Sequence, residues 1–458
     1  MKRRSICILL ALIHLLSLGG CVSDLIDTQG MMSPPKANTD QQEIHHLLQG
    51  TSPNLTFVYP KTGDYRSAII IRDLNGDGKE DAIGFIALDA GIEVQFLEKT
   101  DAVWRSIGRF RNAANEVDRV CFGDVTGDGL DDILIGWGNA QSISATLGVY
   151  SYQGVRFTET LFDTKYDDLV LTDFDGDQIQ EIFLLERTVV AQDETMETIP
   201  ARAEYFSLKD GAIRPLGSAE ADSAVTKFSG ISFGAITKDL MGVVSDGAKS
   251  DGSMTTQIFF KGETGQLQGL PRNPNVLAFT SPFLRPTGPF FTAMDINQDG
   301  FIEIPTVKSL PALPPETVSS PDSTSFLVDW NRIRPQGDPI YLRLMTAFMN
   351  VSENYWFRTP HWLESELTAV NDPVLRTVVY HRVETGRDVL GEEVQLMGPR
   401  LFGIRVFSRA AWEERAGLTD YDPLIEEDEQ IYALVTYTKE EKYLTAIKKI
   451  KETFSLLA

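Results

Sequence analysis

Cysteine and histidine are both scarce in this chain, which has three cysteines and five histidines among 458 residues. Cys7 and Cys21 fall within an amino-terminal leader and at its end, so Cys121 stands alone and no intrachain disulfide is expected. Cys121 lies in an apolar run and is predicted to be a buried filler, not a nucleophile. The sequence also lacks the G-x-S-x-G, P-loop, H-E-x-x-H and C-x-x-C patterns. No catalytic residue is therefore predicted.

Basic residues are outnumbered by acids, with 42 Lys and Arg against 65 Asp and Glu and a net charge of −23. Removal of the leader, which carries three basic residues and no acid, brings the charge to about −26. A surface this acidic argues against nucleic acid as a partner and against attraction to anionic lipids. Beyond the leader there is no apolar run of about 18 residues or more, so no other membrane span is expected.

The first residues of the chain have the organisation of an export signal. Residues 1–4 are basic and residues 6–18 are apolar, which predicts a signal peptide over residues 1–20. The signal ends in Leu-Gly-Gly-Cys, which resembles the bacterial lipobox and predicts lipidation of Cys21; an ordinary secretory signal is the alternative. Residues 21–50 are predicted to be a tether with a short helix at 40–49. The expected location is extracytoplasmic, with the lipid in the outer face of the cell membrane.

One nine-residue pattern occurs four times, beginning at Asp73, Asp124, Asp173 and Asp295. A carboxylate or amide stands at positions one, three, five and nine of each copy, except for Thr126 at position three of the second. Calcium takes six to eight oxygen ligands, and short side chains at alternate positions of a tight loop supply them. A glycine at position six lets the chain turn, so that the position-seven carbonyl also faces the ion.

A single stretch of this composition is typical of a solvated turn, because Asp, Asn and Gly dominate turns. Four copies in register between apolar runs favour calcium loops instead. They are not EF-hands, which need a glutamate at position twelve; that position holds Gly84, Ile135, Leu184 or Thr306. We expect weak affinity, on the order of 10⁻⁴ to 10⁻³ M, with the metal acting as a structural brace.

The flanks of the loops are short apolar runs without a helical period, which predicts strands covered on both faces. The loop starts are 51 and 49 residues apart and then 122, so a worn copy is expected midway along the last interval. Residues 230–244 keep a strand, turn and strand there without the carboxylates. Five units of roughly 50 to 60 residues indicate a mainly β fold, a β-propeller of about five blades over residues 51–349. An extra blade made from the segments before 68 and after 310 is the alternative.

Strand, D-x-D-G-D-G-x-x-D loop and strand at this period resemble the FG-GAP/VCBS repeats of calcium-bound β-propellers such as integrin α-chain heads, over residues 55–335. The whole chain also looks like a VCBS-repeat lipoprotein of Gram-positive bacteria. The resemblance implies about four calcium ions, with position seven contributing its carbonyl. The implied ligands are Asp73, Asn75, Asp77, Lys79, Asp81, Asp124, Thr126, Asp128, Leu130, Asp132, Asp173, Asp175, Asp177, Ile179, Glu181, Asp295, Asn297, Asp299, Phe301 and Glu303.

This chain departs from the family pattern in three places. Gln178 replaces the glycine usual at position six, and Thr126 lowers the charge of the second site. The worn loop around Ala235, Thr237 and Asp239 is expected to hold no ion.

Residues 350–458 are predicted to form a small α+β domain. Its expected elements are strands at 374–381, 401–407 and 430–437, a helix capped by Ser408, and a last helix with a Thr438–Glu441 capping box. The aromatic residues 355–357 and Trp362 suit either a sugar-stacking surface or a core, and we favour the core because aromatics dominate core burial.

Three functions remain open at this point. The favoured one is a non-catalytic cell-surface lipoprotein whose calcium-stabilised propeller binds a glycan or a protein. The second is a calcium-dependent polysaccharide lyase or hydrolase, since some calcium propellers of the repeat type that this chain resembles are lyases. The third is an envelope scaffold whose tail domain contacts a partner lipoprotein or a transporter.

Overall fold

The computed structural model describes residues 39–50, 56–140, 144–190, 198–272, 275, 281–287, 291–313, 323–335, 337, 340–414 and 420–457. The predicted signal peptide at 1–20, the predicted lipidation site Cys21 and the predicted tether up to residue 38 lie outside this set. The described fold is mainly β, as predicted from the apolar runs between turns. No helix in the described ranges is long and apolar enough to cross a membrane.

Five antiparallel sheets follow one another along the chain, each built largely from consecutive strands. The first sheet contains β1 (Ile69–Arg72), β2 (Asp81–Leu88), β3 (Gly91–Thr100) and β4 (Val103–Asn112). The second contains β5 (Glu116–Gly123), β6 (Asp132–Gly138), β7 (Ala145–Tyr152) and β8 (Phe157–Tyr166). The strands predicted on both sides of the first two acidic loops are therefore confirmed.

The third sheet repeats this order and adds an insertion. It contains β9 (Asp168–Thr172), β10 (Glu181–Glu186), β13 (Arg202–Ser207) and β14 (Arg214–Glu220), with the small hairpin of β11 (Val189–Val190) and β12 (Thr198–Ile199) after β10 and the 3-10 turn η1 (Lys209–Gly211) after β13. The fourth contains β15 (Val225–Thr237), β16 (Leu240–Lys249), β17 (Ser253–Lys261) and β18 (Leu267–Leu270), with β19 (Arg285–Pro286) paired to β17. The worn unit expected at 230–244 is thus a strand, turn and strand, as predicted.

The fifth sheet joins strands from both sides of the predicted boundary at residue 350. It contains β20 (Ile304–Lys308), β21 (Ser325–Ile333), β22 (Tyr341–Asn350), β23 (Tyr355–Arg358) and β29 (Ser455–Leu456). β23 was assigned to the tail from the sequence, but a tight turn after β22 returns it to the same sheet, where it pairs with the end of the chain.

The tail forms a sixth sheet with two helices and the 3-10 turn η4 (His361–Leu363). Its elements are β24 (Leu367–Asp372), β25 (Thr377–Arg387), β26 (Glu393–Ser408), β27 (Tyr421–Glu427), β28 (Gln430–Thr436), α4 (Arg409–Glu414) and α5 (Glu441–Thr453). The predicted cap of α4 is confirmed, since the Ala411 amide donates to Ser408 Oγ. The predicted capping box of α5 is wrong: Glu440 is the N-cap, and Thr438 Oγ1 accepts from the Glu440 amide instead.

Neighbouring sheets share apolar cores, and this explains why the strands are apolar at successive positions. In β6, Ile133 and Ile135 face the first sheet and Leu134 faces the third. In β10, Ile182 faces the second sheet and Phe183 faces the fourth. Successive side chains of a strand point to opposite faces, so a strand covered on both sides must be apolar at both parities.

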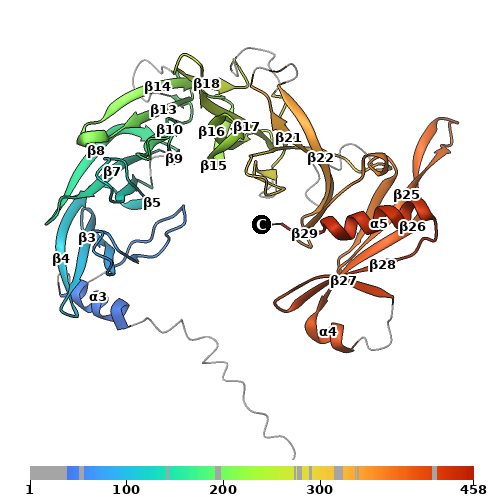
Figure 1. Cartoon of the computed structure of the whole chain (residues 1–458), viewed down its shortest axis with the longest axis horizontal. Coiled ribbons are helices and arrows are strands. Elements are labelled where there is room, and N and C mark those ends of the chain that lie inside the picture. Colours follow the sequence, from blue (N-terminus) through green and yellow to red (C-terminus); the bar gives the residue numbers. More distant parts are fainter. Residues whose placement is uncertain are drawn as a thin grey trace, which may run out of the picture.

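The five sheets lie along an arc that is open between the first sheet and the tail (Figure 1). At one end, α3 (Thr39–Gln49) confirms the predicted short helix and packs Ile44 and Leu48 on β2, β3 and β4. At the other end, the fifth and sixth sheets share a core with α5 that contains Phe348, Phe357 and Tyr380. Each end of the arc is therefore covered by a different element.

Candidate metal centres

The first three acidic loops connect β1 to β2, β5 to β6 and β9 to β10, and the fourth leads from an isolated bridge at Met294 into β20. The backbones of the four loops are folded alike. In the first loop, the two oxygens of Asp73 accept the amides of Gly76 and Gly78 at 2.8 and 2.9 Å. The equivalent bonds to Asp124 measure 2.6 and 2.9 Å, and those to Asp173 measure 2.7 and 3.1 Å. In the fourth loop, Asp295 accepts the amides of positions five and six at 3.0 and 2.7 Å.

Positions four and six adopt a left-handed backbone in every one of these loops. Glycine occupies most of them, with φ of 75° and 80° at Gly76 and Gly78. Gln178 at position six of the third loop has φ 69°, and Gln298 at position four of the fourth has φ 58°. The departure noted at Gln178 therefore does not change the loop's course, although a side chain in this region carries a steric cost.

The carboxylate at position nine is buried in all four loops, unlike its partners at the loop surface. Asp81, Asp132, Glu181 and Glu303 are 1%, 2%, 6% and 0% exposed. The first three accept the amide of position two at 2.9 to 3.0 Å, which fixes the loop over its own sheet. Burial raises the pKa of each, to about 6 for Asp81 and to about 7 for Glu303.

Glu303 has the least compensated of these carboxylates. Its Oε1 accepts from Arg332 at 3.1 Å, whereas its buried Oε2 has no hydrogen-bond partner among the described residues. The charges of Asp299 and Asp295 raise the Glu303 pKa further. A cation at this position would pair with Oε2 and would offset the repulsion from Asp299 and Asp295. The residues present therefore fit a hard metal ion such as calcium.

Three predicted carboxylate ligands of the third loop lie close together. One oxygen from each of Asp173, Asp175 and Asp177 lies within 4.8 Å of the others. Position three holds Asn75, Thr126 or Asn297 in the other loops, so an equivalent group of three carboxylates does not arise from their first, third and fifth positions. Their side-chain oxygens remain suitable calcium ligands in kind.

Basic side chains already contact position five in three of the loops. Lys79 Nζ lies 3.0 Å from Asp77, Lys209 Nζ lies 3.1 Å from Asp177, and Arg332 pairs with Asp299. These contacts partly neutralise the acids and lower the pKa of Asp77, mainly through its bond to Lys79. A bound ion would compete with them, which is consistent with the weak affinity expected from the sequence.

The side chains at position seven have a role that the ligand pattern did not reveal. A methyl group built on Gly76 would lie 2.5 Å from Leu130 of the second loop, and one on Gly127 would lie 2.7 Å from Ile179 of the third. Each of these apolar side chains therefore covers the position-four glycine of the preceding loop. The sequence signal that could have indicated this contact is an apolar residue at position seven of one loop together with a glycine at position four of the loop before it.

The fourth unit has no acidic loop. β15 runs to Thr237 and β16 begins at Leu240, so Ala235 lies within a hairpin strand. Ala235 still contacts the fourth loop, since its carbonyl accepts the amide of Ile302 at 2.9 Å.

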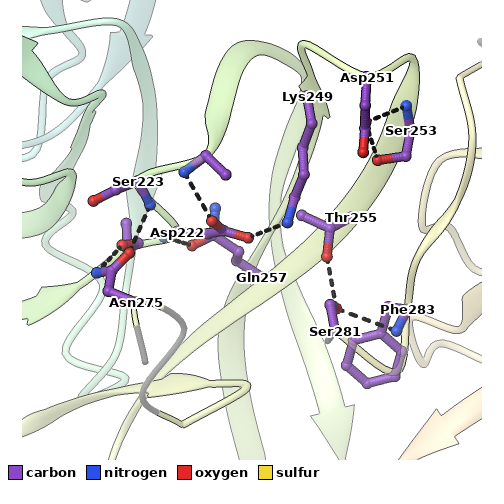
Figure 2. A network of polar contacts seen from close by, with 12 residues as sticks. Asp222, Ser223, Lys249, Asp251, Ser253, Thr255, Gln257, Asn275, Ser281 and Phe283 are labelled. Atoms are coloured by element: carbon purple, nitrogen blue, oxygen red, sulfur yellow. Dashed lines mark hydrogen bonds and ion pairs between the residues drawn. The ribbon is translucent and has the colours of Figure 1, made fainter. Parts of the chain in front are cut away.

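Side-chain hydrogen bonds secure the connections of the fourth unit (Figure 2). Asp222 binds Lys249 Nζ at 2.7 Å, and its amide donates to Gln257 at 2.6 Å. Asn275 accepts the amide of Ser223 at 2.9 Å. These polar side chains secure the connection between β14 and β15, at the end of the β15–β16 hairpin opposite its turn.

The aromatic residues singled out near 355 divide into two kinds. Tyr355 and Phe357 are fully buried in the core shared by the fifth and sixth sheets, as favoured from the sequence. Trp362 is 41% exposed and stacks at a tilt near Tyr443, with ring centroids 5.8 Å apart. Trp362 and the half-buried Trp356 are therefore accessible to a ligand, whereas Tyr355 and Phe357 are not.

No family model matches the chain, and no curated protein matches it. Among solved structures, a rhamnogalacturonan lyase is similar at 10% identity over 75% of this chain and 77% of that chain, with a TM-score of 0.29. A protein from Lactobacillus plantarum is 10% identical over 70% and 84% of the two chains, with a TM-score of 0.28. A glycoside hydrolase family 43 arabinoxylan arabinofuranohydrolase from Bacillus subtilis is 9% identical over 81% and 75%, with a TM-score of 0.29. These values are too low to bear on function, which is inferred below from the chain's own residues.

Proposed function

We propose that the chain is a cell-surface lipoprotein whose calcium-braced, propeller-like array of about five blades is a non-catalytic module for binding a glycan or a protein. The observation that supports it most is the common geometry of the four loops, each with a buried carboxylate at position nine and exposed oxygens around it. Lipidation of Cys21 and the extracytoplasmic location belong to the same proposal, because a calcium brace suits the calcium-rich exterior of a cell.

The ion is proposed to act as a brace. The loop carboxylates already accept the amides of their own backbone, so they are committed to holding the loop together. Calcium would add ligands between positions one, three, five and nine and would neutralise the buried charge. Because Leu130 and Ile179 reach from one loop to the preceding one, bracing their loop also fixes the junction between its sheet and the preceding sheet.

Soluble protein of residues 36–458 tests the binding function against a panel of wall and extracellular polysaccharides, in calcium and in chelator. We expect retention on at least one polysaccharide without release of oligosaccharides, with weaker retention in chelator. New oligosaccharide products would instead establish a lyase or hydrolase. The absence of both retention and products would contradict a glycan module. The protein-binding forms of the proposal would then remain, with the tail as the surface to test by pull-down.

A further inference from the structure

A cleft of about 630 Å³ lies between the fifth sheet and α5. Its walls come from β22, β23, the turn η4 and α5. A second hollow of about 400 Å³ shares Arg358 and Thr453 with it and reaches Asp295 of the fourth acidic loop. Volumes of this size are typical of sites for small organic ligands.

The cleft presents basic groups on a strongly acidic protein. Three basic residues and two acids line it, in a chain of net charge −23. Arg343 is engaged with Glu364 at 2.9 Å, but the side chains of Arg358 and Lys449 have no acidic partner among the described residues. Both are exposed. Arg358 on β23 and Lys449 on α5 outnumber Glu452, the second acid that lines the cleft, so the cleft attracts an anion.

Two further side chains indicate a hydroxyl-bearing, ring-containing ligand. Trp362 lines the cleft with 41% of its surface exposed, and flat indole surfaces stack on the apolar faces of sugar rings. Thr359 also lines the cleft and is 3% exposed, yet its Oγ1 has no hydrogen-bond partner in the described part of the chain. Buried hydroxyls are normally paired, so this Oγ1 lacks a hydrogen bond that a ligand hydroxyl would supply after a turn of the Thr359 side chain toward the cleft.

We propose that this cleft is the ligand site of the module and that it takes an anionic glycan. The acidic groups of the glycan lie against Arg358 and Lys449, one ring stacks on Trp362, and a hydroxyl pairs with Thr359. A peptide that binds as an added strand is less suited, because β29 already pairs with the edge of β23 that the peptide would join. The inference rests on the proposed binding function and specifies its site and ligand class.

The test is titration calorimetry with residues 36–458 in excess calcium. The probes are hexagalacturonate, its full methyl ester, a sulfated chondroitin hexasaccharide and hexaglutamate. We expect at least one of the two anionic glycans to bind, and the methyl ester to bind at least tenfold more weakly than hexagalacturonate if the carboxylate is the group recognised. Binding of the sulfated probe alone would identify a sulfated ligand of the same class.

The variant Arg358→Gln/Lys449→Gln should raise the Kd for the binding glycan at least tenfold. Lys448→Gln, the matched control on the next exposed position of α5, should leave it unchanged. Trp362→Phe should abolish the quenching of tryptophan fluorescence on binding.

Three results would overturn the inference. They are failure of both anionic glycans to bind, an equal loss of affinity in Lys448→Gln, and binding of hexaglutamate as tight as that of either glycan. If the double variant keeps the parent's retention on the polysaccharide panel, the proposed function stands and the cleft is the wrong site. If the parent also fails on the panel, the glycan form of the proposed function fails with it.

Discussion

At the scale of single residues, the buried carboxylate of Glu303 links the stability of the fold to pH. Its pKa is about 7 in the folded chain against an ordinary value of 4.5, so the folded state holds a proton that the unfolded state has lost between these values. The contribution of Glu303 to the free energy of unfolding is therefore fully present below about pH 4.5 and is lost as the pH rises through about 7. Asp81, with a pKa of about 6, acts in the same direction.

We predict that in chelator the melting temperature falls as the pH is raised from 5 to 8, and that excess calcium flattens this dependence. Glu303→Gln removes the charge at constant shape, so it should reduce the slope in chelator. The same variant should gain less from calcium at pH 8 than the parent gains. Melting curves across this pH range check both effects, and an unchanged slope in Glu303→Gln would contradict the assignment.

Gln178 is a second residue that is expected to lower the free energy of unfolding. Its φ of 69° places a side chain in the left-handed region, which costs about 1 to 2 kcal/mol relative to glycine. Gln178→Gly should therefore raise the free energy of unfolding in chelator by about 1 kcal/mol. Denaturant titration measures it, with Gly78→Gln as the reciprocal control that should lose a similar amount. No gain in Gln178→Gly and no loss in Gly78→Gln would mean that a side chain at position six causes no backbone strain.

At the scale of elements, the contacts between successive loops can be separated from the strain within each loop. Gly127→Ala places a methyl group against Ile179, whereas Gly176→Ala meets nothing within 4 Å, and the two glycines have similar φ of 81° and 75°. We predict that Gly127→Ala costs about 1 kcal/mol more than Gly176→Ala. Adding Ile179→Ala should remove this difference in a double-mutant cycle, measured by denaturant titration. An equal cost for both glycines would show that the loops do not contact each other through position seven.

The strand–loop–strand units could be predicted from the sequence because each is local. The apolar runs on both sides of a loop reflect burial on both faces, and the spacing of the loops located even the unit around Ala235 that has lost its carboxylates. The fold class follows from these units. The chemical identity of the loop oxygens could also be inferred, since it depends only on residue type and spacing.

What could not be predicted depends on contacts between distant segments. β23 joins the fifth sheet through a local hairpin with β22, but its other edge pairs with Ser455 and Leu456, about a hundred residues later, and no periodicity indicates such a pairing. The contacts of Leu130 and Ile179 with the preceding loops arise only when sheets are stacked. α5 begins at Glu441 and not directly after Thr438, because Thr438 Oγ1 accepts the Glu440 amide in a local turn. The sequence pattern of a capping box does not distinguish this turn from a helix cap.

At the scale of the whole molecule, α3 covers the end of the arc that the tail does not reach (Figure 1). Leu48 is fully buried, and its side chain lies against Gly84 of β2. Leu48→Ala should cost about 2 to 5 kcal/mol in unfolding free energy. Leu47→Ala, on a half-buried position of the same helix, should cost clearly less. Denaturant titration of both variants tests whether α3 stabilises the first sheet. Equally small losses of unfolding free energy in the two variants would mean that the first sheet is stable without the helix.

The central claim is that calcium braces the array of sheets through the acidic loops. The most direct measurement is the melting temperature of residues 36–458 in calcium and in chelator, for the parent and for Asp124→Ala/Asp128→Ala. Asp89→Ala/Asp163→Ala, two exposed aspartates outside the loops, is the matched control. We predict that calcium raises the melting temperature of the parent and of the control by several degrees, and raises that of the loop variant by less. The same melting temperature in calcium and in chelator for the parent would contradict the central claim.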